Sequence, residues 1–326
     1  MAHELAFFTD GRARIAYVGQ TPWHGLGQQL TPNAPLEVWA KEAGMDFQIL
    51  GSPVSFKTGS GKTFAYGKKQ VLYRGDTEEA LSVVGDRYRV VQPLEVLEFF
   101  RNLVADHGFQ LETAGVLFNG AKYWALARTG EEVRIKGQDV IRQYLMLGTA
   151  CDGSMQTTAK LVDTRVVCNN TIEIAASEDG GSIKVRHSSK FCAEDVQAEL
   201  GLASKTWKEH VNKVQALADR KISNKEAVDY VIKLLGDPEK PVEAQPSANT
   251  IARVLQLYQG EALGADLKAA KGTAWGLVNA VTQVVDWHKG RDQNHRLASA
   301  WFYEGGRLKQ QAFSQAVNDF VYAKAA

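Results

Sequence analysis

The stretch FQLETAGVLFNGAKYWALA, residues 109–127, says most about the fold of this chain. Apolar residues alternate with polar or small ones along it, as they do in β-strands that bury one face. Asn119-Gly120 interrupts the alternation, and this dipeptide favours a tight turn with positive φ angles. We therefore predict a β-hairpin over residues 109–127.

Strand-forming and helix-forming segments flank this hairpin. Upstream, residues 54–91 consist of short β-rich runs broken by glycines, and residues 93–108 carry the spacing of an amphipathic helix that begins at a proline and ends at a glycine. Downstream, residues 140–147 and 157–176 have strand patterns, and a short strand is expected at 183–186. This half of the chain therefore mixes strands and helix.

The second half of the chain changes to helical periodicity from about residue 193. Further helices are expected at about 249–260, 272–289 and 306–324. The predicted fold class is α+β, with a mixed or antiparallel sheet and packed helices in the N-terminal half and a helical C-terminal half. We place an α+β core domain with an N-terminal arm at residues 1–190. A helical region at residues 191–326 follows, with a proline-containing linker near residues 236–248.

The composition describes an ordinary globular protein. Of the 326 residues, 44% are hydrophobic and 23% are charged, which excludes disorder along the whole chain. The formal net charge is only +1. Attraction to nucleic acid must therefore come from local patches of cations, because the molecule as a whole has almost no excess charge.

Cysteine content and hydropathy favour a cytoplasmic protein. The three cysteines, Cys151, Cys168 and Cys192, are odd in number and lack paired spacing, which indicates a reducing compartment. Residues 1–4 do not begin a signal-peptide pattern, and no run approaches the ~18–20 apolar residues that cross a bilayer. We therefore expect a cytoplasmic location and no membrane partner.

Short motifs are spread along the chain in a fixed order. They are PWHGLG at 22–27, CDGS at 151–154, RVVCNNT at 165–171, VRHS at 185–188, TAWG at 273–276, NAVT at 279–282 and SAWF at 299–302. Together they resemble the phage/plasmid-like protein family, which is built on a domain of unknown function and is encoded on phages, prophages and conjugative plasmids. The resemblance implies work on incoming or replicating DNA, or interference with host defences.

Two further points follow from this resemblance. Cys151 stands where the family usually has His, so the chain departs from the family pattern at that position. A remoter similarity connects the chain to the single-strand annealing proteins of recombination. Those proteins pack a small sheet on a helix, assemble into rings or filaments, and hold DNA in a basic groove, which implies that this chain forms homo-oligomers.

Residues 57–74 combine cations with aromatic rings. The segment contains Lys57, Lys62, Lys68, Lys69 and Arg74, with Phe64, Tyr66 and Tyr73 between them, and it has no acidic residue. Single-stranded DNA is bound by cations that neutralise phosphates beside rings that stack on bases. We therefore predict that the lysines and Arg74 hold the backbone while Tyr66 and Tyr73 support bases. The alternative is a solvated hairpin whose aromatic residues lie in the core.

A second set of polar residues lies on the strands that follow. Lys160, Arg165, Lys184, Arg186 and His187 are expected to form a positive strip that faces phosphate. The less favoured alternative is thiol catalysis, with Cys168 as nucleophile, His187 as base and Asp152 as orienting acid. A cysteine inside an apolar strand is usually a buried small hydrophobic residue, so no catalytic residue is assigned.

Cofactor and metal sites are not predicted. Gly59-Ser60-Gly61-Lys62-Thr63 resembles the end of a phosphate-binding P-loop, but Phe56 occupies the position of its first glycine. The histidines are scattered, without the spacing of a zinc site. We expect no cofactor and no metal.

The function predicted from these features is single-stranded DNA binding for a mobile element, with strand annealing in recombination that needs no nucleotide hydrolysis. Two alternatives remain open. One is an interaction protein that counters a host defence or regulates DNA transfer by binding a host protein. The weaker one is a thiol-dependent or nuclease-type enzyme.

Overall fold

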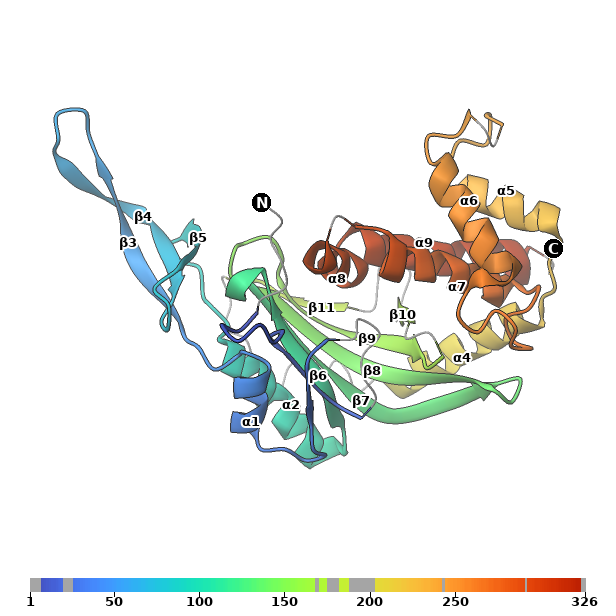
Figure 1. Cartoon of the computed structure of the whole chain (residues 1–326), viewed down its shortest axis with the longest axis horizontal. Coiled ribbons are helices and arrows are strands. Elements are labelled where there is room, and N and C mark those ends of the chain that lie inside the picture. Colours follow the sequence, from blue (N-terminus) through green and yellow to red (C-terminus); the bar gives the residue numbers. More distant parts are fainter. Residues whose placement is uncertain are drawn as a thin grey trace. The chain divides into compact units, whose positions relative to one another are not determined.

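The computed structural model describes residues 7–19, 26–167, 170–174, 182–187, 203–241, 244–290 and 292–323. The chain forms two compact units, shown in Figure 1. Unit 1 comprises residues 1–130, 144–160 and 182–201, and unit 2 comprises residues 131–143, 161–181 and 202–326. The prediction placed one boundary near residue 190, whereas the chain divides at several points because strands β7, β8 and β9 each contribute residues to both units.

The fold is α+β, as predicted. The larger sheet has the strand order β10-β9-β8-β7-β6-β1-β2, with β11 paired to β9. Its strands are β1 (Ile15–Val18), β2 (Gln28–Leu30), β6 (Gln110–Leu117), β7 (Lys122–Ile135), β8 (Asp139–Ala150), β9 (Thr157–Arg165), β10 (Asn170–Glu173) and β11 (Ser182–Val185). The sheet is mixed, because β1 runs parallel to β2 and antiparallel to β6.

The hairpin predicted at residues 109–127 is confirmed as β6 and β7. These strands pair antiparallel, and Leu117 lies opposite Lys122 across a short 3-10 turn. Asn119 and Gly120 have φ angles of 55° and 107° in that turn. A side chain at Gly120 would also collide with the Phe47 ring and the Arg74 guanidinium, so glycine is required there for two reasons.

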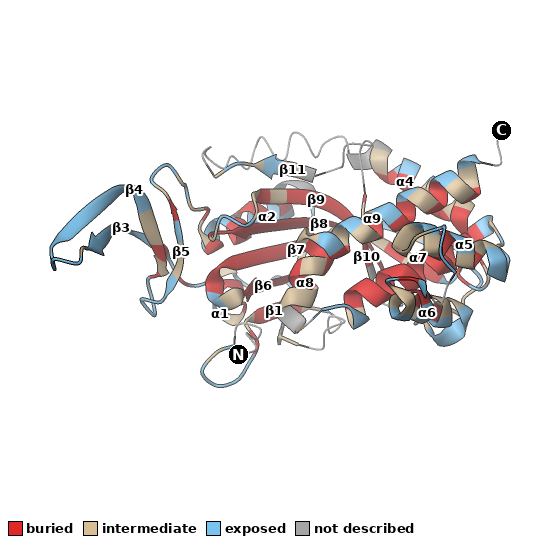
Figure 2. Ribbon diagram, turned by 90° about the horizontal axis from the view of Figure 1, so that it is seen from above, coloured by how far each residue is buried: buried red, intermediate tan, exposed pale blue. Residues whose placement is uncertain are grey.

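Two helices pack on the core of unit 1. They are α1 (Leu36–Glu42) and α2 (Pro93–His107), and the second confirms the helix predicted from its apolar spacing. The side chain of Glu95 accepts a hydrogen bond from the Gln92 backbone at the start of α2, and Gly108 ends the helix with a φ of 69°. Figure 2 shows the buried residues that these helices and the sheet contribute.

A smaller three-stranded sheet belongs to unit 1. Its strands are β3 (Ile49–Lys57), β4 (Thr63–Arg74) and β5 (Ala80–Gly85), in the order β3-β4-β5. At one end of this sheet the side chains of Ile49, Leu72 and Val84 are buried. Figures 1 and 2 show the other end of β3 and β4 extending away from the rest of unit 1 as an exposed hairpin.

Unit 2 is built mainly from helices. They are α4 (Ala203–Asp219), α5 (Asn224–Leu235), α6 (Ala248–Gln256), α7 (Ala274–Gln283), α8 (Gln293–Phe302) and α9 (Glu304–Val317), with π-helical turns η3 (Leu257–Glu261), η4 (Val284–His288) and η5 (Asn318–Tyr322). Every residue of α7 is buried, so this helix is the centre of the unit. The helices expected at 249–260, 272–289 and 306–324 correspond to α6, α7 and α9 with the π-helical turns that extend them.

Candidate nucleic-acid interface

The exposed half of β3 and β4 is the part of unit 1 on which the predicted binding residues concentrate. We call residues 54–69 the outer hairpin. Its cross-strand register shifts between Pro53 and Val54, and beyond the shift all residues from 55 to 69 are exposed except the half-buried Thr58. The outer hairpin therefore has no hydrophobic core of its own.

One face of the outer hairpin carries aromatic side chains. Val54 pairs with Tyr66 and Phe56 pairs with Phe64, and residues at these alternate positions share a face. The rings of Phe56 and Phe64 stack with centroids 5.9 Å apart. Phe56, Phe64 and Tyr66 are 50%, 48% and 46% exposed. This aromatic face rules out the alternative in which Phe64 and Tyr66 are core residues.

The four lysines surround this face at different positions. Lys57 lies on the opposite face of the hairpin, because its neighbour Phe56 is on the aromatic face. Lys62 belongs to the turn, where its carbonyl accepts a hydrogen bond from the Thr58 amide at 2.9 Å. The register shift leaves Gly67, Lys68 and Lys69 without partners in β3, so both of these lysines lie at an irregular point of β4.

No carboxylate neutralises these lysines. Within the described chain, Lys57, Lys62, Lys68 and Lys69 make no ion pair, and all four are exposed. The segment from Phe47 to Gly75 contains no acidic residue. A protein of net charge +1 thus concentrates four uncompensated cations on one exposed hairpin.

Tyr73 and Arg74 lie outside this exposed surface. Tyr73 is half-buried, and Arg74 is 1% exposed. The Arg74 guanidinium donates to both carboxylate oxygens of Asp76, at 2.9 and 2.6 Å, and its carbon lies 3.7 Å from the centre of the Phe47 ring. These hydrogen bonds lower the pKa of Asp76. Arg74 therefore stabilises the small sheet. Because its guanidinium is buried, it is not among the residues that we propose to contact phosphate.

The second predicted strip does not form one exposed surface. Lys184 and Arg186 are exposed, but Lys160 is buried. Arg165 is also buried, and its Nε donates to Asp139 at 2.7 Å. Lys160 and Arg165 therefore lie outside the proposed interface, because burial prevents their charges from contacting an external phosphate.

His187 has a structural environment in unit 1. Its ring stacks on Tyr88 at 4.4 Å. Its Nδ1 lies 3.2 Å from the Arg89 carbonyl oxygen, and its Nε2 lies 3.0 Å from the Met155 carbonyl oxygen. Both ring nitrogens thus face backbone acceptors, which leaves neither directed at a substrate.

Four residues of the predicted motifs, Cys168, Asn169, Trp23 and His24, lie outside the described residues.

Asp152 and Cys151 have structural roles. Burial would raise the pKa of Asp152, but hydrogen bonds from Lys122 and Ser154 lower it overall, and Lys122 Nζ lies 2.5 Å from the carboxylate. Burial and the neighbouring Asp152 charge raise the pKa of the Cys151 thiol to about 12. Among the described residues, neither Asp152 nor Cys151 therefore belongs to a reactive thiol centre.

Cys151 is accordingly expected to resist alkylation in the folded protein. Only the thiolate reacts readily, and a thiol with a pKa of about 12 has almost none near neutral pH. Treatment of the native protein with iodoacetamide, followed by peptide mass mapping, should leave Cys151 unmodified. The urea-denatured protein should be modified there, and rapid modification of the native chain at Cys151 would contradict its buried placement.

Phe56 belongs to the aromatic face but was not predicted as a binding residue. A pattern in the sequence indicates its position. Phe56 precedes the turn by the same number of positions by which Phe64 follows it, since residues 57 and 63 pair across the hairpin. Two apolar-x-apolar runs, Val54 to Phe56 and Phe64 to Tyr66, therefore indicate a shared face. Predicting that this face is exposed requires the structure.

None of the helices in the described part of the chain has the length and apolar character needed to span a membrane. Among the same residues, no group of three or more histidine, cysteine or acidic side chains is arranged to hold a metal ion.

Comparison with known proteins identifies a family for this chain. A family model described as "Domain of unknown function (DUF932)" matches residues 80–301, which is more than half of the chain. No curated protein and no solved structure matches the chain. The outer hairpin precedes the matched residues.

Proposed function

Because this chain belongs to the family of the domain of unknown function DUF932, whose description names no activity, we propose a function from the chain's own surface: it binds single-stranded DNA through the outer hairpin. The observation that carries this proposal is the aromatic face, on which three rings remain about half exposed beside four lysines that make no ion pair with any described residue. The rings stack on bases, and the lysines neutralise backbone phosphates. No bond is broken in this function, so no catalytic residue is needed.

The magnitudes favour the rings as the main source of affinity. Stacking on an aromatic side chain contributes ~1–3 kcal/mol per base. Four phosphate contacts to a single strand correspond to a slope of about −3 for log K against log salt concentration. The net charge of +1 adds little to either quantity. Binding should therefore be moderately sensitive to salt and should persist in part when the lysines are screened.

The biological task that fits this binding is strand annealing for a mobile element in the cytoplasm. Rings that stack on one side of a strand leave the pairing edges of its bases free to meet a complementary strand. The distributed motifs that resemble the phage/plasmid-like family support this setting. Annealing also requires several copies to cover a strand, so the proposal includes a homo-oligomer. Nucleotide hydrolysis has no part in it, because residues 59–62 lie in the turn between β3 and β4 instead of between a strand and a helix.

A protein partner is the second candidate, and the same aromatic face favours it. Exposed aromatic side chains rimmed by charges are typical of protein–protein interfaces. In this case the chain would bind a host protein to counter a defence or regulate DNA transfer. The two candidates differ in their response to salt and in their need for DNA.

Replacement of Lys68 and Lys69 by Glu is expected to weaken binding of a fluorescent oligothymidine strongly. The Lys68→Glu/Lys69→Glu variant removes two phosphate contacts and adds two repulsive charges, so the salt slope should fall by about 1.4. Fluorescence anisotropy titrations at two salt concentrations measure both the affinity and the slope.

The matched control has the same change in net charge on the surface of unit 2. Lys208 in α4 and Lys225 in α5 are exposed and belong to unit 2. The Lys208→Glu/Lys225→Glu variant should keep the affinity and slope of the native protein. If the native protein fails to bind the oligonucleotide even at low salt, the DNA-binding proposal is wrong and the protein-partner candidate replaces it.

A further inference from the structure

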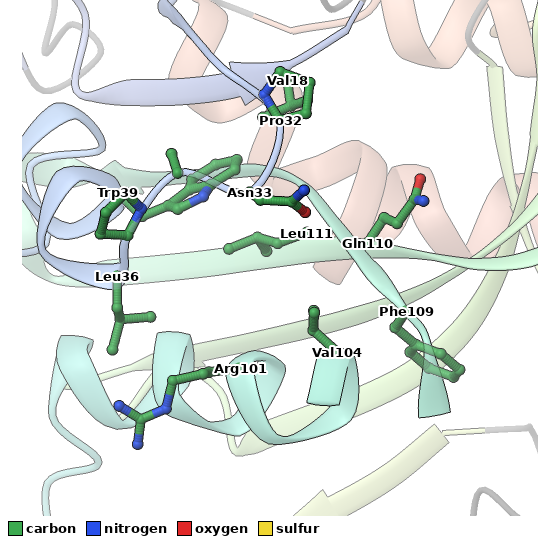
Figure 3. Close-up of a pocket in the computed structure, with 12 residues that line it drawn as sticks. Val18, Pro32, Asn33, Leu36, Trp39, Arg101, Val104, Phe109, Gln110 and Leu111 are labelled. Carbon is green, nitrogen blue, oxygen red and sulfur yellow. The ribbon is translucent and has the colours of Figure 1, made fainter. Parts of the chain in front are cut away.

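A cavity of about 460 Å³ lies in unit 1. The residues that line it come from segments of the sequence outside the outer hairpin. Its walls come from α1, α2, β6 and the segment before α1, as Figure 3 shows. Leu36 and Trp39 contribute from α1, Val104 from α2 and Leu111 from β6, so most of the lining is apolar. A cavity of this size and character is in the range that holds small organic molecules.

The polar groups of this cavity are donors or neutral amides. Asn33 and Gln110 contribute carboxamides to its lining, and Arg101 lies on α2 with its guanidinium pointing away from them (Figure 3). Among the described residues that line the cavity, none is acidic, and Arg101 is the only charged one. The lining therefore favours an anion over a cation.

One of these donors has no partner in the described part of the chain. Arg101 is exposed and makes no ion pair or hydrogen bond there, so its guanidinium can turn toward the cavity mouth. Trp39 is 4% exposed and lines the same cavity, so its ring offers a large apolar surface to a ligand.

We propose that this cavity binds a small organic carboxylate with an apolar body. The apolar part lies against Trp39, Val104 and Leu111, and the carboxylate meets Arg101 at the mouth. The carboxamides of Asn33 and Gln110 hold a further polar atom of the ligand. This site is independent of the outer hairpin and of DNA binding.

Calorimetric titration with two matched probes tests this site. The probes are naphthalene-2-carboxylate and its neutral amide, naphthalene-2-carboxamide, which share the apolar body. The native protein should bind the carboxylate about fivefold more tightly than the amide, because an exposed ion pair contributes up to ~1 kcal/mol. Arg101→Gln should remove this preference and leave amide binding unchanged. Arg87→Gln, at an exposed arginine elsewhere in unit 1, should keep the preference.

A cavity-filling variant tests the place of binding. Val104 is 38% exposed, so a larger side chain is accommodated at the helix surface without disturbing the core. Val104→Trp should abolish binding of both probes and keep the affinity for oligothymidine. If neither probe binds the native protein, or if Arg101→Gln leaves the preference intact, the proposed site is wrong. Loss of DNA binding alone would affect only the function assigned to the outer hairpin.

Discussion

The Phe64→Ala/Tyr66→Ala variant should bind single-stranded DNA at least about 30-fold more weakly than the native protein, because two stacked bases lose ~2 kcal/mol or more. The two side chains are about half exposed and lie on the aromatic face of the outer hairpin. Their removal therefore costs the fold little. Fluorescence anisotropy with an oligothymidine of about 16 nucleotides, the upper site size of a single binding fold, measures the affinity.

Ring-preserving substitutions provide the control for this prediction. Phe64→Tyr and Tyr66→Phe keep an aromatic face on the hairpin, so both variants should bind like the native protein. Tyr322→Ala removes a ring that is 54% exposed in unit 2 and should have no effect. An unchanged affinity in the Phe64→Ala/Tyr66→Ala variant, with circular dichroism showing the native fold, would exclude stacking by these residues.

The rings and the lysines should act on different parameters of binding. Removal of the rings lowers the affinity at every salt concentration, because stacking does not involve counterion release. Removal of Lys68 and Lys69 changes the salt slope itself. A protein partner that used the same aromatic face would show neither pattern with DNA. The comparison of the two variants therefore identifies DNA contacts more securely than either loss alone.

The parts of the fold that sequence predicted correctly depend on local patterns. The β6–β7 hairpin follows from alternation and from the conformational preference of Asn119-Gly120. Helix α2 follows from a proline at its start, apolar spacing along one face and Gly108 at its end. The prediction passed over α5, although Ser223 and Glu226 form a capping box that marks its start. In each of these elements the deciding residues lie close together in sequence.

The candidate site was harder to predict because burial depends on distant partners. Arg74 and Arg165 were grouped with the exposed lysines on charge alone. Arg74 lies against the ring of Phe47, and Arg165 contacts Asp139, 26 positions away. The lysines of the outer hairpin have no such partner in the described chain. A count of cations in sequence does not separate these two environments, whereas the packing of each strand does.

Replacement of Arg165 by Gln should destabilise unit 2 by ~3–5 kcal/mol, the usual cost of leaving one buried charge without its partner. Arg165 and Asp139 are 2% and 0% exposed, and the Arg165 Nε lies 2.7 Å from one carboxylate oxygen. The guanidinium also donates to the carbonyls of Leu263 and Gly264, at 3.2 and 2.9 Å. In the variant, Asp139 would retain the hydrogen bond from the Trp275 indole, at 3.1 Å, but no neutralising charge. Urea unfolding followed by circular dichroism measures the loss.

An exposed ion pair of the same unit provides the control. It separates the effect of burial on stability from the effect of losing a charge. Lys233 pairs with Asp319 at 2.7 Å, and the lysine is 57% exposed, so Lys233→Gln should change the stability by no more than ~1 kcal/mol. The Asp139→Asn/Arg165→Gln variant removes both charges and should recover part of the lost stability. Folded Arg165→Gln protein should bind oligothymidine with native affinity, because the proposed contacts lie on the outer hairpin. Weakened DNA binding with unchanged stability would instead return Arg165 to the interface, and the buried ion pair would no longer explain why this arginine is present.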